Sequence, residues 1–187
     1  MIKIGLIGED PTDTGAIKHL MKQKFGKGFH FFTLSKKQTG SKMLNQAAIR
    51  AYNFEIQKHK PNHIIVIMDA DAIITEKNKI QAKQGLYNNR KKEINCNNIL
   101  LLNIYELEAL ALADIDSFNE HYNSKVKFTG SVSHKEDPKK YLKNETDKKY
   151  KESDCPEIFK HLQFDTVMKN CSYFEEFIAN FEDVVKN

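Results

Sequence analysis

Acidic side chains follow three apolar segments of the chain, each at the point where the segment ends. In chain order these acids are Glu9 and Asp10 after IKIGLIG, Asp69 and Asp71 after HIIVIM, and Glu106 and Glu108 after NILLLNIY. Carboxylates that crowd together repel one another, so a cluster of them is tolerated best around a positive charge. Oxygen ligands suit Mg²⁺, which binds a few carboxylates and keeps several of its waters. The acids therefore predict a Mg²⁺ or Mn²⁺ site where the three segments meet.

Asp69 and Asp71 stand two residues apart directly after an apolar run. If the chain stays extended there, side chains at i and i+2 point to the same side, and both carboxylates can reach one cation. Asp71 has an alternative role as the cap of a following helix. Asp69 ends the run itself, where capping does not apply, so the pair favours metal binding.

The acids at the other two positions have structural alternatives. Asp10 precedes a proline, and an aspartate followed by proline is a good helix start. Asp13 would then occupy the third helical position, where a carboxylate binds exposed backbone N–H groups. Glu106 and Glu108 also stand where a helix is expected to begin, and acids are common there. Glu9 has no capping role, which favours a functional one.

The elements that position these acids alternate between strand and helix patterns. The sequence predicts strands over 2–7, 29–34, 63–68 and 98–103, and helices over 11–24, 41–60, 75–93 and 106–114. The continuous β-branched run at 63–68 is typical of a strand buried on both faces. Such alternation predicts an α/β fold with a mostly parallel four-stranded sheet flanked by helices. Ligands bind such sheets outside the carboxyl ends of the strands, where the acids fall.

The pattern changes after about residue 115. A lysine-rich polar segment is followed by a stretch in which Phe174, Phe177, Ile178 and Phe181 fit one helix face. We therefore predict an α/β core over 1–115 and, over 116–187, a helical extension packed on that core.

Composition narrows the class of protein. The 187 residues are 40% hydrophobic and 29% charged, and no apolar run approaches the length of a membrane span. We expect no signal peptide and no membrane contact. The three cysteines are far apart, which favours reduced thiols and a cytoplasmic location. A net charge of +4 permits a polyanionic partner without requiring one.

Three motifs together resemble a known family. GEDPTDTGAIKHLM, VIMDADA and YELEALALAD are similar to the EGxTD, DxDA and ExEAWLxAD motifs of a bacterial Toprim-like family of unknown function. The Toprim fold, a Rossmann-like α/β core, occurs in topoisomerases, primases and overcoming-lysogenization-defect nucleases. Two positions depart from the family pattern: Asp10 replaces the glycine after the glutamate, and Leu110 replaces the tryptophan.

The resemblance implies a Mg²⁺-dependent Toprim nuclease, often encoded beside a phage-defence ATPase that would be its partner. Carried over, Glu9 matches the glutamate that serves as acid/base or ligand. Asp69 and Asp71 match the metal-binding DxD, and Glu108 matches the glutamate before Ala-Trp. We therefore expect Glu9 and Asp69 to be catalytic, with Glu9, Asp69, Asp71 and Glu108 holding Mg²⁺ or Mn²⁺ during phosphodiester cleavage of DNA or RNA.

Lysines provide candidate contacts to a nucleic-acid backbone. The candidates are Lys36, Lys37, Lys91 and Lys92, with further lysine pairs at 139–140 and 148–149. Exposed lysines that only solvate the surface are the alternative.

Two other functions remain open on the sequence. The chain could be a non-catalytic subunit with a vestigial metal site, whose helical C-terminus docks an ATPase. It could also be a receiver-like phosphoacceptor domain, which would need a lysine after a fifth strand, and the sequence offers no such strand.

Overall fold

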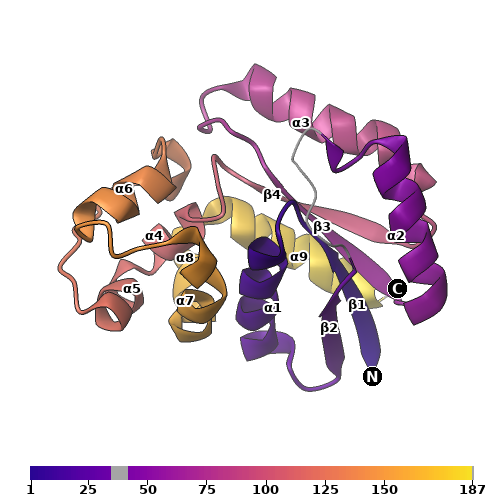
Figure 1. The fold of residues 1–187 in the computed structure, drawn as a ribbon, viewed down its shortest axis with the longest axis horizontal. Coiled ribbons are helices and arrows are strands. Elements are labelled where there is room, and N and C mark those ends of the chain that lie inside the picture. Colours follow the sequence, from indigo (N-terminus) through magenta and orange to yellow (C-terminus); the bar gives the residue numbers. More distant parts are fainter. Residues whose placement is uncertain (35–41, 187) are drawn as a thin grey trace.

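The computed structural model describes residues 1–34 and 42–186. A four-stranded sheet lies between two layers of helices (Figure 1). The strands are β1 (Ile2–Ile7), β2 (Phe29–Thr33), β3 (His63–Asp69) and β4 (Asn98–Asn103). They are ordered β2-β1-β3-β4, and every neighbouring pair is parallel. The predicted α/β fold class is confirmed, and each predicted strand forms within one residue of its expected bounds.

Helices follow the strands and continue to the C-terminal end of the described chain. They are α1 (Pro11–Phe25), α2 (Gln46–His59), α3 (Lys77–Arg90), α4 (Ala109–Ala113), α5 (Ile115–Tyr122), α6 (Pro138–Glu145), α7 (Cys155–His161), α8 (Phe164–Asn170) and α9 (Ser172–Lys186). Short 3₁₀ turns are η2 (Lys91–Glu93), η3 (Val132–His134) and η4 (Glu152–Asp154). None of the described helices is long and apolar enough to cross a membrane.

Three helices are shorter than the sequence predicts. One is α3, which covers Lys77–Arg90 of the expected 75–93. The helix expected over 41–60 begins at Gln46, because the Asn45 side chain accepts a hydrogen bond from the Ala48 N–H at 2.8 Å and caps it there. The helix expected over 106–114 begins at Ala109, with Glu108 as its N-cap. For α2, a cap residue, which periodicity does not detect, sets the first turn. Glu108 makes no side-chain cap hydrogen bond, and residues 107–108 form a turn before α4.

The two faces of the sheet pack against different helices. Ile4, Leu6, Ile65 and Ile67 belong to one core with α1 and the helices from α4 to α9. The opposite face, which includes Ile64, Val66 and Met68, packs against α2 and α3. β3 is therefore buried on both faces, which explains its unbroken apolar sequence.

α9 covers the sheet on the α1 face. The aromatic side chains predicted to share a helix face, Phe174, Phe177 and Phe181, are buried there with Ile178. The Phe181 ring lies 5.1 Å from that of Phe25 and 6.0 Å from that of Phe29 between centroids. The helical extension thus adds its apolar face to the core of the sheet (Figure 1).

The order in which the strands are added to the sheet reverses between β1 and β3. From β1 the chain passes through α1 on one face to β2, whereas from β3 it passes through α3 on the other face to β4. Segments that leave neighbouring strands toward opposite faces open a crevice between them, and ligands of such sheets bind there. Because Ile7 pairs with Val66, the chain after β1 and the last residues of β3 reach this crevice together.

Candidate functional site

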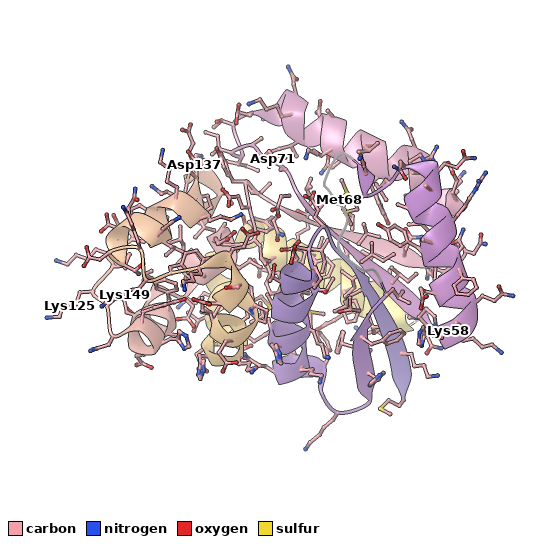
Figure 2. The ribbon with its side chains drawn as sticks, viewed as in Figure 1. Lys58, Met68, Asp71, Lys125, Asp137 and Lys149 are labelled. Carbon is pink, nitrogen blue, oxygen red and sulfur yellow. The ribbon has the colours of Figure 1, made fainter. Side chains whose placement is uncertain are left out.

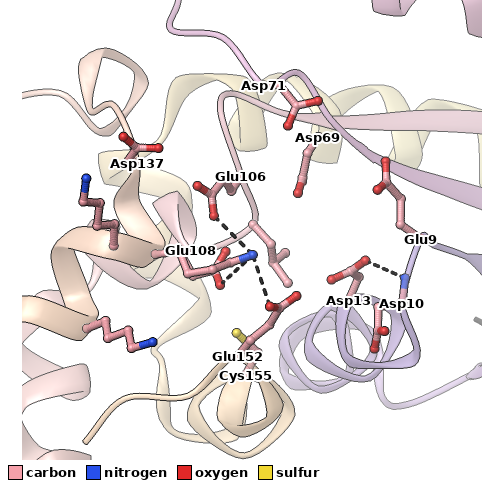
Figure 3. Close-up of a pocket in the computed structure, with 14 residues that line it drawn as sticks. Glu9, Asp10, Asp13, Asp69, Asp71, Glu106, Glu108, Asp137, Glu152 and Cys155 are labelled. Carbon is pink, nitrogen blue, oxygen red and sulfur yellow. Dashed lines mark hydrogen bonds and ion pairs between the residues drawn. The ribbon is translucent and has the colours of Figure 1, made fainter. Parts of the chain in front are cut away.

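An acidic pocket of about 730 Å³ lies outside the carboxyl ends of the strands. It is lined by Glu9, Asp10, Asp13, Asp69, Asp71, Glu106, Glu108, Asp137 and Glu152, and by Lys139, Lys140 and Lys143. All four predicted metal-binding residues are among them (Figure 3). In the view of the whole molecule, Asp71 and Asp137 lie in the upper part, whereas Lys58, near the end of α2, lies at the lower right (Figure 2). The structure thus brings acids from three strand ends into one space.

The start of α1 contributes three of these acids. Asp10 caps the helix: its Oδ1 accepts a hydrogen bond from the Thr12 N–H at 3.0 Å, and its own N–H donates to Asp13 Oδ2 at 2.9 Å. The predicted capping role of Asp10 and Asp13 is confirmed. Glu9 makes no hydrogen bond or ion pair with any residue in the described ranges. Capping therefore explains Asp10, and it explains one oxygen of Asp13, but it does not explain Glu9.

Burial changes the acid–base properties of Glu9 and Asp13. It raises the pKa of Glu9, while Lys83 lowers that pKa and Asp71 raises it again. Burial also raises the pKa of Asp13 to about 6, and the neighbouring charges of Asp10, Glu108 and Glu9 add to the effect. Both groups are therefore easier to protonate than ordinary carboxyls.

Asp69 ends β3 beside the end of β4. The Asn103 Nδ2 donates a hydrogen bond to Asp69 Oδ1 at 3.0 Å, which fixes the orientation of the carboxyl. Burial raises the pKa of Asp69 well above its ordinary value; the Asn103 bond opposes this, and Asp13 and Glu108 add to it. Figure 3 shows the carboxyls of Glu9, Asp13 and Asp69 around a common space.

The chain does not stay extended after Asp69. Asp71 has a φ of 51°, in the left-handed region, so the i and i+2 argument for two parallel side chains does not describe its backbone. Its side chain is 71% exposed and pairs with Lys83 Nζ at 2.6 Å. Its N–H donates to the Tyr105 carbonyl at 3.0 Å, which ties this turn to the one after β4. Asp71 thus lines the acidic pocket with a cation already beside it.

The acids after β4 surround a lysine of α6. Lys139 Nζ lies 3.4 Å from Glu106 Oε2, 3.8 Å from Glu108 Oε1 and 3.3 Å from Glu152 Oε2 (Figure 3). Tyr150 holds the second of these acids, because its hydroxyl donates to Glu108 Oε1 at 2.7 Å. This group, Lys139 with Glu106, Glu108 and Glu152, is called the lysine-centred cluster below.

Burial is the main cause of the raised pKa of the two glutamates after β4. It raises the pKa of Glu106 to about 7, with Glu108 adding and Lys139 opposing. It also raises the pKa of Glu108, against Lys139 and the Tyr150 hydrogen bond. For Lys139, burial lowers the pKa, but Glu108, Glu106 and Glu152 outweigh it and raise the pKa overall. The ammonium therefore stays charged at any physiological pH.

None of the four lysines expected to contact nucleic acid is among the described residues that line the acidic pocket. Lys36 and Lys37 lie outside the described residues. Lys91 and Lys92 belong to η2, which precedes the amino end of β4, and neither lines the acidic pocket. The pocket instead has Lys139, Lys140 and Lys143 on one flank. The sequence analysis named Lys139 and Lys140 only as a possible contact to the nucleic-acid backbone. No local pattern could pair Lys139 with Glu106 and Glu108, which stand more than 30 residues earlier.

The donors of the acidic pocket fit a hard divalent cation in their chemistry, since carboxylate oxygens are the ligands that Mg²⁺ prefers. Over residues 1–34 and 42–186, no group of three or more His, Cys, Asp or Glu side chains is placed closely enough to hold a metal ion. Glu9 raises the pKa of both Asp13 and Asp69, and repulsion of this kind is a physical reason for such spacing.

Comparison with known proteins identifies a family. Residues 8–182 match the family described as Domain of unknown function (DUF4276). No curated protein and no solved structure matches the chain. The match spans all three acidic motifs and the helices up to α9. The chain therefore belongs to the family described as Domain of unknown function (DUF4276).

Proposed function

We propose that this chain is a Mg²⁺- or Mn²⁺-dependent nuclease of the Toprim type, which hydrolyses phosphodiester bonds of DNA or RNA. The observation that carries the proposal is the position of Glu9 and Asp69 in one acidic pocket at the crevice between β1 and β3. Neither carboxyl pairs with a lysine or arginine of the described chain, and the similarity to Toprim motifs supports the same two residues.

Each residue has a role that follows from its surroundings. A bound Mg²⁺ would stabilise charge on the phosphate and make a bound water more acidic. Glu9, with its raised pKa and no hydrogen-bonding partner among the described residues, is suited to accept a proton from the attacking water. Asp69 is oriented by Asn103 toward the same space and would hold the cation. Asp71, which pairs with Lys83, completes the proposed ligand set. The resemblance alone adds Glu108, whose Oε1 lies 3.8 Å from Lys139 Nζ.

The α6 flank of the acidic pocket is suited to the substrate backbone. Lys140 and Lys143 line the pocket and form no ion pair with any described residue. A lysine without an acidic partner can bind a phosphate and release a counter-ion. A polyanionic substrate would therefore lie between α6 and the strand ends, with its phosphates at the lysines and one phosphodiester near Glu9.

The proposal is tested by incubating the purified chain with DNA and with RNA in Mg²⁺, in Mn²⁺ and in EDTA. The same assays are run with the ATPase expected to be encoded beside it. Cleavage should require metal. Glu9→Gln should lower turnover at least about 10²-fold, because it removes the proton acceptor while keeping side-chain size. The matched control is Glu157→Gln, an exposed glutamate of α7 paired with Lys160.

Two results would contradict the proposal. One is the absence of cleavage in either metal, with and without the ATPase; this would favour the non-catalytic subunit. The other is Glu9→Gln cutting as fast as the unmodified chain.

A further inference from the structure

Six of the nine described acids that line the pocket form two groups that differ in their counter-charge. Three carboxylates, those of Glu106, Glu108 and Glu152, lie within 3.8 Å of one ammonium, Lys139 Nζ. The other group, Glu9, Asp13 and Asp69, forms no ion pair with a lysine, arginine or histidine of the described chain. Lys139 therefore supplies a cation to one side of the acidic pocket. On the other side, Glu9, Asp13 and Asp69 have no ion-paired cation among the described residues, although Asp71 beside them pairs with Lys83.

Contacts with buried and partly buried side chains fix the position of Lys139. Its partner Glu108 is buried, with 3% of the side chain exposed, and Glu106 is partly buried, with 14% exposed. Tyr150 holds Glu108 from the far side through a 2.7 Å hydrogen bond, and the Tyr150 hydroxyl also lies 3.1 Å from Cys155 Sγ. Pro138 begins α6 and places Lys139 in its first turn. A buried carboxylate whose partner is removed would be strongly destabilised unless another cation or a proton took its place.

We propose that the Lys139 ammonium occupies one of two cation positions in the acidic pocket, so that only the Glu9–Asp69 side takes a divalent metal. This inference rests on the proposed function for the presence of that metal. Glu108 is then the anchor of Lys139 and not a metal ligand, which changes its expected role. Asp13, whose Oδ2 accepts from the Asp10 N–H, is the third acid on the metal side.

The inference predicts that removing the ammonium opens a second divalent position. Mn²⁺ binding is measured by calorimetry and by the EPR signal of free Mn²⁺. Lys139→Met should bind one more Mn²⁺ per chain than the unmodified protein, because Glu106 and Glu108 lose their internal cation. Lys139→Arg keeps the charge and should keep the original number. Lys160→Met, which removes a surface partner of Glu157, is the matched control and should also change nothing.

Two further variants sharpen the test. Lys139→Gln is neutral but can hydrogen-bond two glutamates, so it carries the same prediction if Lys139→Met does not fold. Glu108→Gln should leave the number of bound Mn²⁺ unchanged, whereas Asp69→Asn should reduce it by one.

The inference is overturned if folded Lys139→Met and Lys139→Gln bind the same number of Mn²⁺ as the unmodified chain. It is also overturned if Glu108→Gln loses a Mn²⁺. These results do not depend on cleavage. A chain that binds Mn²⁺ as predicted but cuts no nucleic acid contradicts the proposed function alone.

Discussion

Single carboxyl groups in the acidic pocket differ in how each is held. Asp10 is used as a helix cap, Asp71 pairs with Lys83 at 2.6 Å, and Asp69 is oriented by Asn103. Glu9 has none of these partners among the described residues. By acid type alone the four residues are equivalent, whereas their partners separate Glu9, the candidate proton acceptor, from acids already held by a backbone N–H, a lysine or an amide.

Asp69→Asn should raise the thermal stability of the metal-free protein. Burial and nearby acids disfavour the charged form of Asp69, and asparagine keeps an oxygen for the Asn103 hydrogen bond. For a chain of this size, 1 kcal/mol corresponds to about 2–4 °C in Tm. The same variant should lose the rise in Tm that Mn²⁺ gives the unmodified protein.

Melting curves with EDTA and with Mn²⁺ check this prediction, with the exposed Asp116→Asn on α5 as control. A large loss of stability in metal-free Asp69→Asn would indicate instead that Asp69 has a structural role.

At the scale of elements, α6 gives the acidic pocket its positive flank. Lys139, Lys140 and Lys143 stand on this one short helix and all line the pocket. Residues three and four apart share a helix face, so Lys143 lies on the same side as the other two. The strand ends thus supply negative groups and α6 supplies positive ones.

Lys140→Ala combined with Lys143→Ala should weaken nucleic-acid binding and flatten its salt dependence. Each lost phosphate contact lowers the slope of log K against log salt by about 0.7–0.9. Fluorescence anisotropy at several salt concentrations measures this.

The comparison variant is Lys91→Ala with Lys92→Ala, which removes two lysines that do not line the pocket. If this second pair lowers the slope more than the α6 pair does, the nucleic acid does not follow α6.

α9 holds the helical layer on the sheet through its aromatic face. Phe181 is fully buried and contacts the rings of Phe25, Phe29 and Phe31. Phe181→Ala should lower the free energy of unfolding by about 3–5 kcal/mol, because it removes a large side chain and leaves a cavity. Urea unfolding measures the change. Phe54→Ala is the control: this ring on α2 is 65% exposed and should change stability little. Similar losses in the two variants would contradict the packing described for α9.

At the scale of the whole molecule, carboxyl groups with a raised pKa gather at one edge of the sheet. In the folded state the pKa of Asp13 is about 6 and that of Glu106 about 7, against ordinary values of 3.8 and 4.5. A carboxyl with a raised pKa binds its proton more tightly in the folded state than in the unfolded state. Folding is then favoured where the group is protonated and disfavoured where it must ionise.

The stability of the metal-free protein should therefore fall as pH rises from about 4 to about 7. The Asp13→Asn/Glu106→Gln double variant should show a smaller fall, because neither new side chain ionises. Exposed Glu76 and Glu157, whose pKa values are lowered by Lys79 and Lys160, act in the opposite direction but are screened by solvent. Thermal melts in EDTA across this pH range check the sign. A stability that rises steadily from pH 4 to 7 in both proteins would contradict it.

Local patterns were sufficient for the fold class and for the bounds of the four strands and α1. The apolar runs of β1, β3 and β4 alternate with helical periodicity, and the aspartate before Pro11 marks the start of α1. These signals depend on neighbours within a few residues, so one sequence contains them. The helix start at Gln46 was missed because a single cap contact of Asn45 sets it.

The sequence also determined which strand-end acids could meet, since parallel strands place their carboxyl ends at one edge. Only the tertiary structure decided how each acid is compensated. Lys139 reaches Glu106 and Glu108 from α6, more than 30 residues later, the backbone at Asp71 turns left-handed, and Lys91 and Lys92 do not line the pocket. Burial and charge depend on what packs nearby in space, and for these residues that neighbourhood comes from distant parts of the chain.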